Sequence, residues 1–158
     1  MTVRLSIGDP APAFTLLDQN GATVTLEQYR GRHLVVYFYP GALTPGCTTQ
    51  SCNLRDAQPD FAELHTAIIG VSPDTPAKQH KFDQTYGLRF PLLADEDHAV
   101  AIAWGVWGEK SLYGKRYLGI LRSAFLVDPT GLIAAAFYEI SPKDTVPKLL
   151  KALAHLQH

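Results

Sequence analysis

The residues best suited to chemistry in this sequence are its two cysteines, Cys47 and Cys52. Cys47 directly follows Thr44-Pro45-Gly46, in which a threonine can cap a helix and a proline suits the first helical position. This places Cys47 in the first turn of a helix, where unpaired backbone N–H groups and the helix dipole favour an anion. The thiolate is the nucleophilic form of cysteine, and an accessible thiolate is readily oxidised to sulfenic acid. The pattern therefore predicts redox chemistry at Cys47.

The sequence also predicts a strand shortly before that helix. Residues 33–39 are an almost unbroken apolar run rich in β-formers, which is typical of a strand buried on both faces. Pro40 ends the run, and a short Pro/Gly loop follows. We predict a helix from 44 to about 64, with a kink or a break at Pro59.

The remaining elements predict a mixed sheet with helices on both faces. The order β-α-β-α, followed by a β-hairpin and a helix, is that of an α/β thioredoxin-like fold with an N-terminal β-hairpin. The expected elements are hairpins at 14–17 with 22–26 and at 123–128 with 132–138, a strand at 66–72, and helices at 75–86, 97–104 and 144–156.

Composition narrows the class of protein. A chain of 158 residues that is 46% hydrophobic can bury a full core, so we expect a single domain over 1–158. A net charge of −1 offers no broad positive field, which argues against nucleic acid or a membrane surface as a partner. The first residues carry no apolar run and no segment is long enough to span a bilayer, so we expect a soluble cytoplasmic protein. Two cysteines are too few for a secreted disulfide scaffold.

The segment around Cys47 resembles a known family. Pro40-x-x-x-Thr44-x-x-Cys47 is similar to the peroxiredoxin signature, and Thr44-Pro45-Gly46-Cys47 followed by Cys52 resembles the PrxQ branch, also called bacterioferritin comigratory protein. The resemblance continues in order along most of the chain, through Leu54-Arg55-Asp56, Asp95-Glu96-Asp97-His98, Gly105-Val106-Trp107-Gly108-Glu109-Lys110 and Gly119-Ile120-x-Arg122-Ser123-x-Phe125.

The resemblance implies a thiol peroxidase that reduces hydrogen peroxide and organic hydroperoxides. Cys47 would be the peroxidatic nucleophile, and Cys52 would resolve its sulfenic acid as an intramolecular disulfide, which thioredoxin or a similar dithiol protein would reduce. Thr44 would place its hydroxyl on the thiolate and the peroxide, and Arg122 would stabilise the developing charge. Pro40 would shield the sulfur from bulk water, and the backbone N–H of Cys47 would complete the donors. The resemblance also implies a monomer.

Two positions depart from the pattern of the family. Gln50 stands where many relatives carry Glu, which predicts an altered hydrogen-bond network rather than lost activity. Ala124 stands where a second hydroxyl often follows Ser123. Neither change affects the set of Pro40, Thr44, Cys47 and Arg122.

The residues alone also allow other interpretations of these side chains. Cys47 and Cys52 could be inert core thiols, and Arg122 an ordinary arginine at a strand edge. The same fold could serve a thiol-disulfide oxidoreductase, although that activity normally uses Cys-x-x-Cys, or a redox-regulated chaperone or sensor. No second cysteine pair and no glycine-rich nucleotide motif accompanies the thiols, so neither a metal nor a cofactor is predicted.

Overall fold

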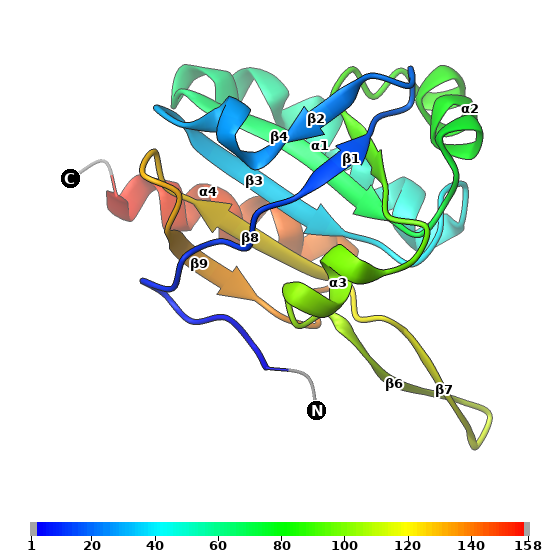
Figure 1. Ribbon diagram of the computed structural model, residues 1–158. Helices are drawn as coiled ribbons and strands as arrows, with labels where there is room; N and C mark the ends of the chain where they lie inside the picture. The colour runs from blue at the N-terminus through cyan, green and yellow to red at the C-terminus, as the bar shows by residue number, and fades with distance from the viewer. Residues whose placement is uncertain (1–2, 157–158) are drawn as a thin grey trace.

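The computed structural model describes residues 3–156 and is built on one seven-stranded sheet (Figure 1). The strand order is β2-β1-β5-β4-β3-β8-β9. The central strands β3, β4 and β5 run parallel, while β1, β8 and β9 pair antiparallel to their neighbours, so the sheet is mixed as predicted. The strands are β1 Thr15–Leu17, β2 Thr23–Thr25, β3 His33–Phe38, β4 Thr66–Ser72, β5 Leu92–Ala94, β8 Ser123–Val127 and β9 Ile133–Phe137.

Helices cover both faces of the sheet. Two long helices, α1 (Pro45–Glu63) and α4 (Thr145–Leu156), lie behind it in Figure 1, and the short α3 (Ala99–Ala103) lies in front. Helix α2 (Pro76–Tyr86) shares the core of α1 and α4 through Phe82. Two 3₁₀ turns complete the helical elements, η1 (Leu26–Tyr29) and η2 (Pro142–Asp144). This is the thioredoxin-like architecture, with its N-terminal hairpin β1–β2, that the order of elements predicted.

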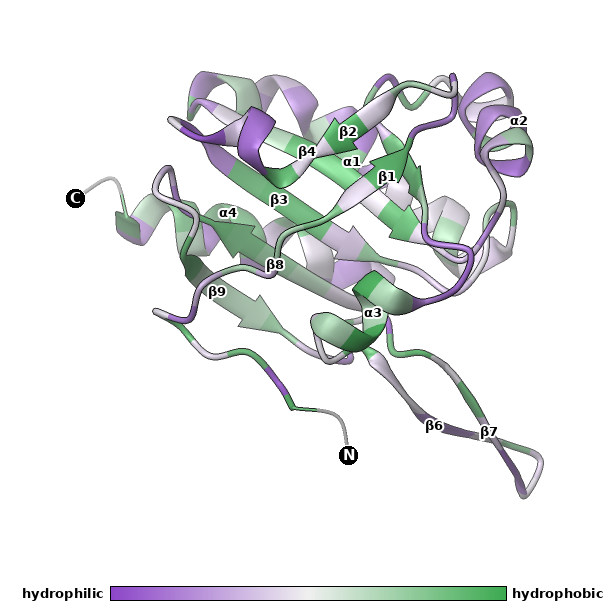
Figure 2. Ribbon diagram, in the orientation of Figure 1, coloured by the Kyte–Doolittle hydropathy of each residue, from purple (hydrophilic) through white to green (hydrophobic). Residues whose placement is uncertain are grey.

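Strand β3 leads into the helix that carries both cysteines. Five of its six side chains are buried, and they alternate between the two cores: Val35 and Tyr37 face α1 and α4, whereas Leu34, Val36 and Phe38 face the other side. The central strands are accordingly among the most hydrophobic segments in Figure 2. Such burial fixes the end of β3 firmly, which is what a reactive residue just beyond it requires.

Helix α1 begins as the sequence predicted, with Thr44 at the N-cap and Pro45 in the first turn. It then runs through Pro59 without a break, so the alternative of a broken helix is wrong. Pro59 itself is exposed, while Leu54, Ala57 and Phe61 on the opposite side are buried in the core. Packing of this face outweighs the one backbone hydrogen bond that proline cannot donate.

Two β-structures were not predicted, in addition to the 3₁₀ turns η1 and η2. The three-residue strand β5 is one, and the other is an antiparallel hairpin of β6 (Trp107–Leu112) and β7 (Lys115–Ile120), which projects from the body of the molecule (Figure 1). The helix expected at 97–104 is shorter, because the buried carboxylate of Asp95 accepts from Val100 N and Ala101 N and so fixes the first turn.

Within residues 3–156, no helix combines the length and apolar character needed to cross a membrane.

Candidate active site

Cys47 lies in the first turn of α1, directly beyond the carboxyl end of β3, and its side chain is fully buried. Arg122 lies in the short connection between β7 and β8. Its Nη2 donates a hydrogen bond to Cys47 Sγ at 3.2 Å. A guanidinium suits an anionic partner, because its charge is permanent and its donors are fixed in one plane. The structure thus brings together two of the residues that the sequence predicted for one site.

Gln50 holds the guanidinium of Arg122 from its other side. Arg122 Nη1 donates to Gln50 Oε1 at 2.8 Å, and Gln50 Nε2 donates to Thr145 Oγ1 at 3.0 Å. The Thr145 hydroxyl in turn donates to the Ser141 carbonyl at 2.9 Å. Gln50 and Thr145 are fully buried, so each of these polar groups relies on the next one for its hydrogen bond. The altered network expected at Gln50 is therefore an uncharged link between Arg122 and the start of α4.

Gly46 makes room for the guanidinium. A Cβ atom at this position would lie 3.1 Å from Arg122 Nη2 and 3.8 Å from Pro142 Cγ. A side chain at 46 would therefore require the Arg122 guanidinium to shift by a few tenths of an ångström. Sequence reasoning assigned Gly46 no such role, although a glycine directly before the cysteine was the available signal.

Thr44 occupies the predicted N-cap position, but its hydroxyl does not make the predicted contact. Its backbone is extended, and its carbonyl accepts from Thr48 N at 2.9 Å. The hydroxyl donates to the Gly41 carbonyl at 2.7 Å rather than to Cys47 Sγ. It makes no side-chain cap either. Pro40, at the start of the loop, is half-buried.

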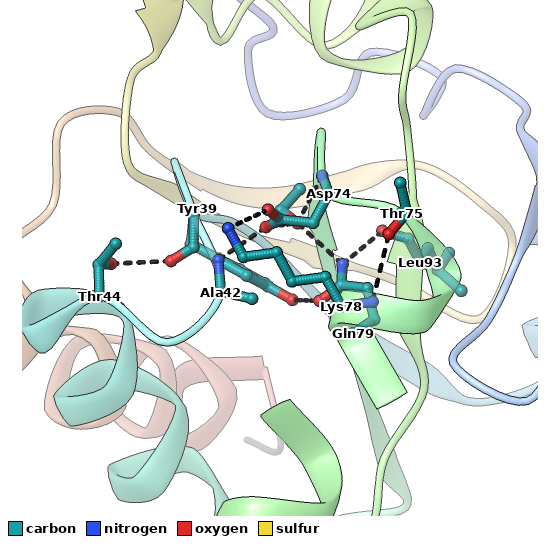
Figure 3. Close-up of polar contacts among 10 residues, drawn as sticks. Tyr39, Ala42, Thr44, Asp74, Thr75, Lys78, Gln79 and Leu93 are labelled. Atoms are coloured by element: carbon teal, nitrogen blue, oxygen red, sulfur yellow. Dashed lines mark hydrogen bonds and ion pairs between the residues drawn. The ribbon is translucent and has the colours of Figure 1, made fainter. Parts of the chain in front are cut away.

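Asp74 ties the loop before Cys47 to the segment between β4 and α2 (Figure 3). Its Oδ2 accepts from Ala42 N and from Ser72 Oγ, both at 2.7 Å, and its Oδ1 pairs with Lys78 Nζ at 3.3 Å. The buried Gln79 amide extends this network by donating to Ser72 Oγ. Sequence reasoning missed Asp74, which fixes the loop from 32 residues further along the chain.

Comparison with known proteins identifies the family. The model of the AhpC/TSA family matches residues 7–136, which include Cys47, Cys52 and Arg122. The chain is a peroxiredoxin of the AhpC/TSA family.

Its relatives place it in the Bcp/PrxQ branch. It is 44% identical to peroxiredoxin Bcp of Bacillus subtilis over 151 residues, covering 96% of each chain. It is 47% identical to peroxiredoxin Bcp of Escherichia coli over 133 residues, covering 84% of this chain and 85% of the other. Among solved structures, it superposes on the bacterioferritin comigratory protein of Xanthomonas campestris with a TM-score of 0.88 at 34% identity, covering 100% of both chains. The structures of that protein address its alkyl peroxide reduction activity.

A second cation and a buried phenol flank Cys47 in this peroxiredoxin. Lys110 of β6 donates from Nζ to the Ile120 carbonyl at 2.9 Å. Burial lowers the pKa of Lys110, and the positive charge of Arg122 lowers it further. Tyr37 shares a 2.7 Å hydrogen bond with Ser51, and burial raises the pKa of its phenol far above the ordinary value. Tyr37 therefore stays neutral and adds no negative charge beside the sulfur.

Cys52 lies about 1.4 turns after Cys47 on the same helix of this peroxiredoxin. Both thiols are free, and Cys52 is half-buried against the core under α1. Five residues of α-helix separate two side chains by about 7.5 Å along the axis and roughly 140° around it. The two cysteines thus belong to one continuous helix but point in different directions.

Proposed function

We propose that this peroxiredoxin reduces hydrogen peroxide and organic hydroperoxides with Cys47 as the nucleophile. The observation that carries the proposal is the 3.2 Å hydrogen bond from Arg122 Nη2 to Cys47 Sγ at the start of α1. The alkyl peroxide reduction activity of the related Xanthomonas protein supports the same chemistry. The Cys47 thiolate attacks one peroxide oxygen, the O–O bond breaks, and the other oxygen leaves as water or an alcohol after taking a proton. Cys47 then carries a sulfenic acid.

The site residues divide this work. Arg122 stabilises the thiolate and the negative charge that spreads over the breaking O–O bond. The backbone N–H of Cys47 adds a donor from the helix terminus. Thr44 is proposed to turn its hydroxyl from the Gly41 carbonyl toward an arriving peroxide. Pro40 is proposed to limit the access of bulk water to the sulfur.

Cys52 is proposed to resolve the sulfenic acid. Its thiol attacks Cys47 Sγ, the sulfenic oxygen leaves as water, and an intramolecular disulfide forms. A disulfide requires Cα atoms within about 7 Å and Cβ atoms that point toward each other. Because the folded helix does not supply that geometry, the first turns of α1 must unwind for the bond to form. Thioredoxin, or another dithiol protein, would then return two electrons to the disulfide.

Replacement of Cys47 tests the proposal directly. Cys47→Ser should abolish peroxide consumption in the presence of a thioredoxin-reducing system, because a serine hydroxyl is far less acidic and less nucleophilic toward peroxide. Substantial turnover in this variant would refute the assignment. Insulin reduction by the wild-type protein provides the second test, since a thiol-disulfide oxidoreductase would catalyse it and a peroxidase would not.

A further inference from the structure

A large groove lies away from the site of Cys47, at the opposite end of the central strands. It has a volume of about 870 Å³, which lies within the range of small-molecule sites. Its walls come from the second half of α1, the end of α2 and the first residues of β4. Neither Cys47 nor Arg122 lines it, so the proposed peroxidase chemistry does not account for it.

The groove exists because β5 is shorter than the strand beside it. Strand β5 pairs only with Gly70–Ser72 of β4, which leaves the edge of β4 before Gly70 without a neighbouring strand. Gly70 N donates to the Pro91 carbonyl across this edge. Because a strand alternates the direction of its backbone groups, the N–H of Ile68 points to the same side. Ile68 lines the groove, so one wall presents a backbone donor as well as side chains.

Three arginines from three separate segments line this groove: Arg32 before β3, Arg55 on α1 and Arg89 after α2. The acidic residue among the lining residues is Asp56, which pairs with Arg55 Nε at 2.9 Å. The lining therefore carries a net positive charge in a chain whose formal charge is −1. A concentration of positive charge in a concave site attracts anions.

Two of the three guanidinium groups have no carboxylate partner in the part of the chain that the structure describes. Within residues 3–156, the ion pairs of the protein do not include Arg32 or Arg89. Arg32 lies over the ring of Tyr29, at 5.0 Å from its centroid. The backbone N–H of Arg89 donates to Asp83 Oδ1, and the side-chain amide of Gln58 donates to the Arg89 carbonyl. Arg89 itself has a φ of +65°. Arg89 thus has a left-handed backbone conformation, which is uncommon for a residue other than glycine.

We propose that this groove binds a small anion that carries several phosphate groups, with Arg32, Arg55 and Arg89 as its ligands. The planar fork of arginine matches phosphate oxygens in pairs, and Arg32 and Arg89 can each offer such a fork. Arg55 already donates from Nε to Asp56 and from Nη1 to the Tyr86 carbonyl, so it contributes its charge and its remaining N–H donors. Several such groups around one cavity suit a polyphosphate chain better than a single charge. The lining also includes apolar side chains, among them Pro59, Ala62 and Phe90. These side chains can cover the carbon part of a nucleotide, so either a free polyphosphate or a nucleoside triphosphate fits this chemistry.

Calorimetric titration of the reduced, full-length protein at low salt tests the proposal. The probes are sodium tripolyphosphate, ATP and adenosine. We expect tripolyphosphate and ATP to bind with Kd below about 1 mM, and adenosine to show no binding at that concentration. ATP at least about threefold tighter than tripolyphosphate would identify the nucleotide as the better ligand; equal affinities would identify the phosphate chain alone. Absence of binding by both phosphate compounds up to about 10 mM would overturn the proposal.

Matched variants separate the groove from general charge attraction. Arg32→Gln and Arg89→Gln should each weaken tripolyphosphate binding about tenfold, because each removes a charged pair of donors. Arg116→Gln is the control, since Arg116 lies on the exposed hairpin and pairs with Glu109. An equal loss in all three variants would refute a specific site. Amide NMR shifts confined to residues 44–50 would also refute it, because the anion would then bind beside Arg122. Peroxidase activity of Arg32→Gln and Arg89→Gln should equal that of the wild type, so the outcome does not depend on the proposed function.

Discussion

The guanidinium of Arg122 is shared between Cys47 and Gln50. Nη2 lies 3.2 Å from Cys47 Sγ, and Nη1 of the same group lies 2.8 Å from Gln50 Oε1. One side of the planar fork is thus held by the protein, and the other side is directed at the sulfur. Since Gln50 is uncharged, the positive charge of Arg122 is not neutralised by its anchor and acts on Cys47.

Arg122→Lys should reduce the rate constant for peroxide reaction by about 100- to 1,000-fold, because lysine keeps the charge but loses the two-sided fork. Stopped-flow measurement of Trp fluorescence on addition of hydrogen peroxide to the reduced protein gives this rate. Arg116→Lys, on the exposed hairpin, is the matched control and should react like the wild type. A wild-type rate in Arg122→Lys would remove Arg122 from the mechanism.

Gln50→Leu should lower the same rate constant by about 10- to 100-fold, because Arg122 loses the acceptor that fixes its orientation. It should also lower the free energy of unfolding by about 1–3 kcal/mol, since buried polar groups lose their partner. Gln50→Glu keeps an acceptor for Arg122 and should restore most of the rate. If Gln50→Glu reacted as slowly as Gln50→Leu, Gln50 would not act by positioning Arg122.

Asp74→Ala should slow the reaction with peroxide and destabilise the fold by about 1–3 kcal/mol, because the buried N–H of Ala42 loses its acceptor. Asp74→Asn retains an oxygen that can accept from Ala42 N, so it should lie close to the wild type in both urea unfolding and stopped-flow kinetics. Lys78→Met removes only the half-exposed ion pair with Asp74 and should change stability by no more than about 1 kcal/mol. A normal rate in Asp74→Ala would show that the loop holds its position without this contact.

The sequence predicted the segment that carries Cys47 because its signals are local. An apolar run predicts the buried strand, and Thr44-Pro45 predicts the start of the helix from residues that are neighbours in the chain. The anchors of Arg122 could not be found this way. The contact between Gln50 and Thr145 joins residues 95 positions apart, and it depends on how α1 packs against α4.

The missed hairpin β6–β7 has a different physical cause. Its turn is formed by Tyr113 and Gly114, with φ of 51° and 77°, which is the conformation of a type I′ turn. Such turns are usually signalled by Asn-Gly or Asp-Gly, and tyrosine gives no such signal. Both faces of the hairpin near its tip are exposed, so its strands also lack the alternation of apolar and polar residues that marks a half-buried strand.

Cys52→Ser should leave the first reaction with peroxide intact and stop the cycle after it. About one peroxide per chain would be consumed, and Cys47 would remain as a sulfenic acid, because the thiol that should attack it is missing. Mass spectrometry after treatment with a dimedone-type reagent should detect the trapped adduct. Full thioredoxin-dependent turnover in Cys52→Ser would mean that another group resolves Cys47.

Formation of the disulfide should loosen the first half of α1. Cys47 and Cys52 lie on one continuous helix, and their separation of about 7.5 Å along the axis and roughly 140° around it does not allow a disulfide. The turns between them must therefore unwind, whereas the second half of α1 can stay folded because Ala57 and Phe61 are buried in the core. Hydrogen exchange followed by mass spectrometry should show faster amide exchange between about residues 44 and 56 in the oxidised protein than in the reduced protein. Peptides from β3 and α4 serve as internal controls and should exchange alike in both states. Cys52→Ser, treated with the same peroxide, should retain the slow exchange of the reduced form, because a sulfenic acid alone does not require the helix to open. Equal protection of residues 44–56 in the reduced and disulfide forms would contradict the unwinding of α1.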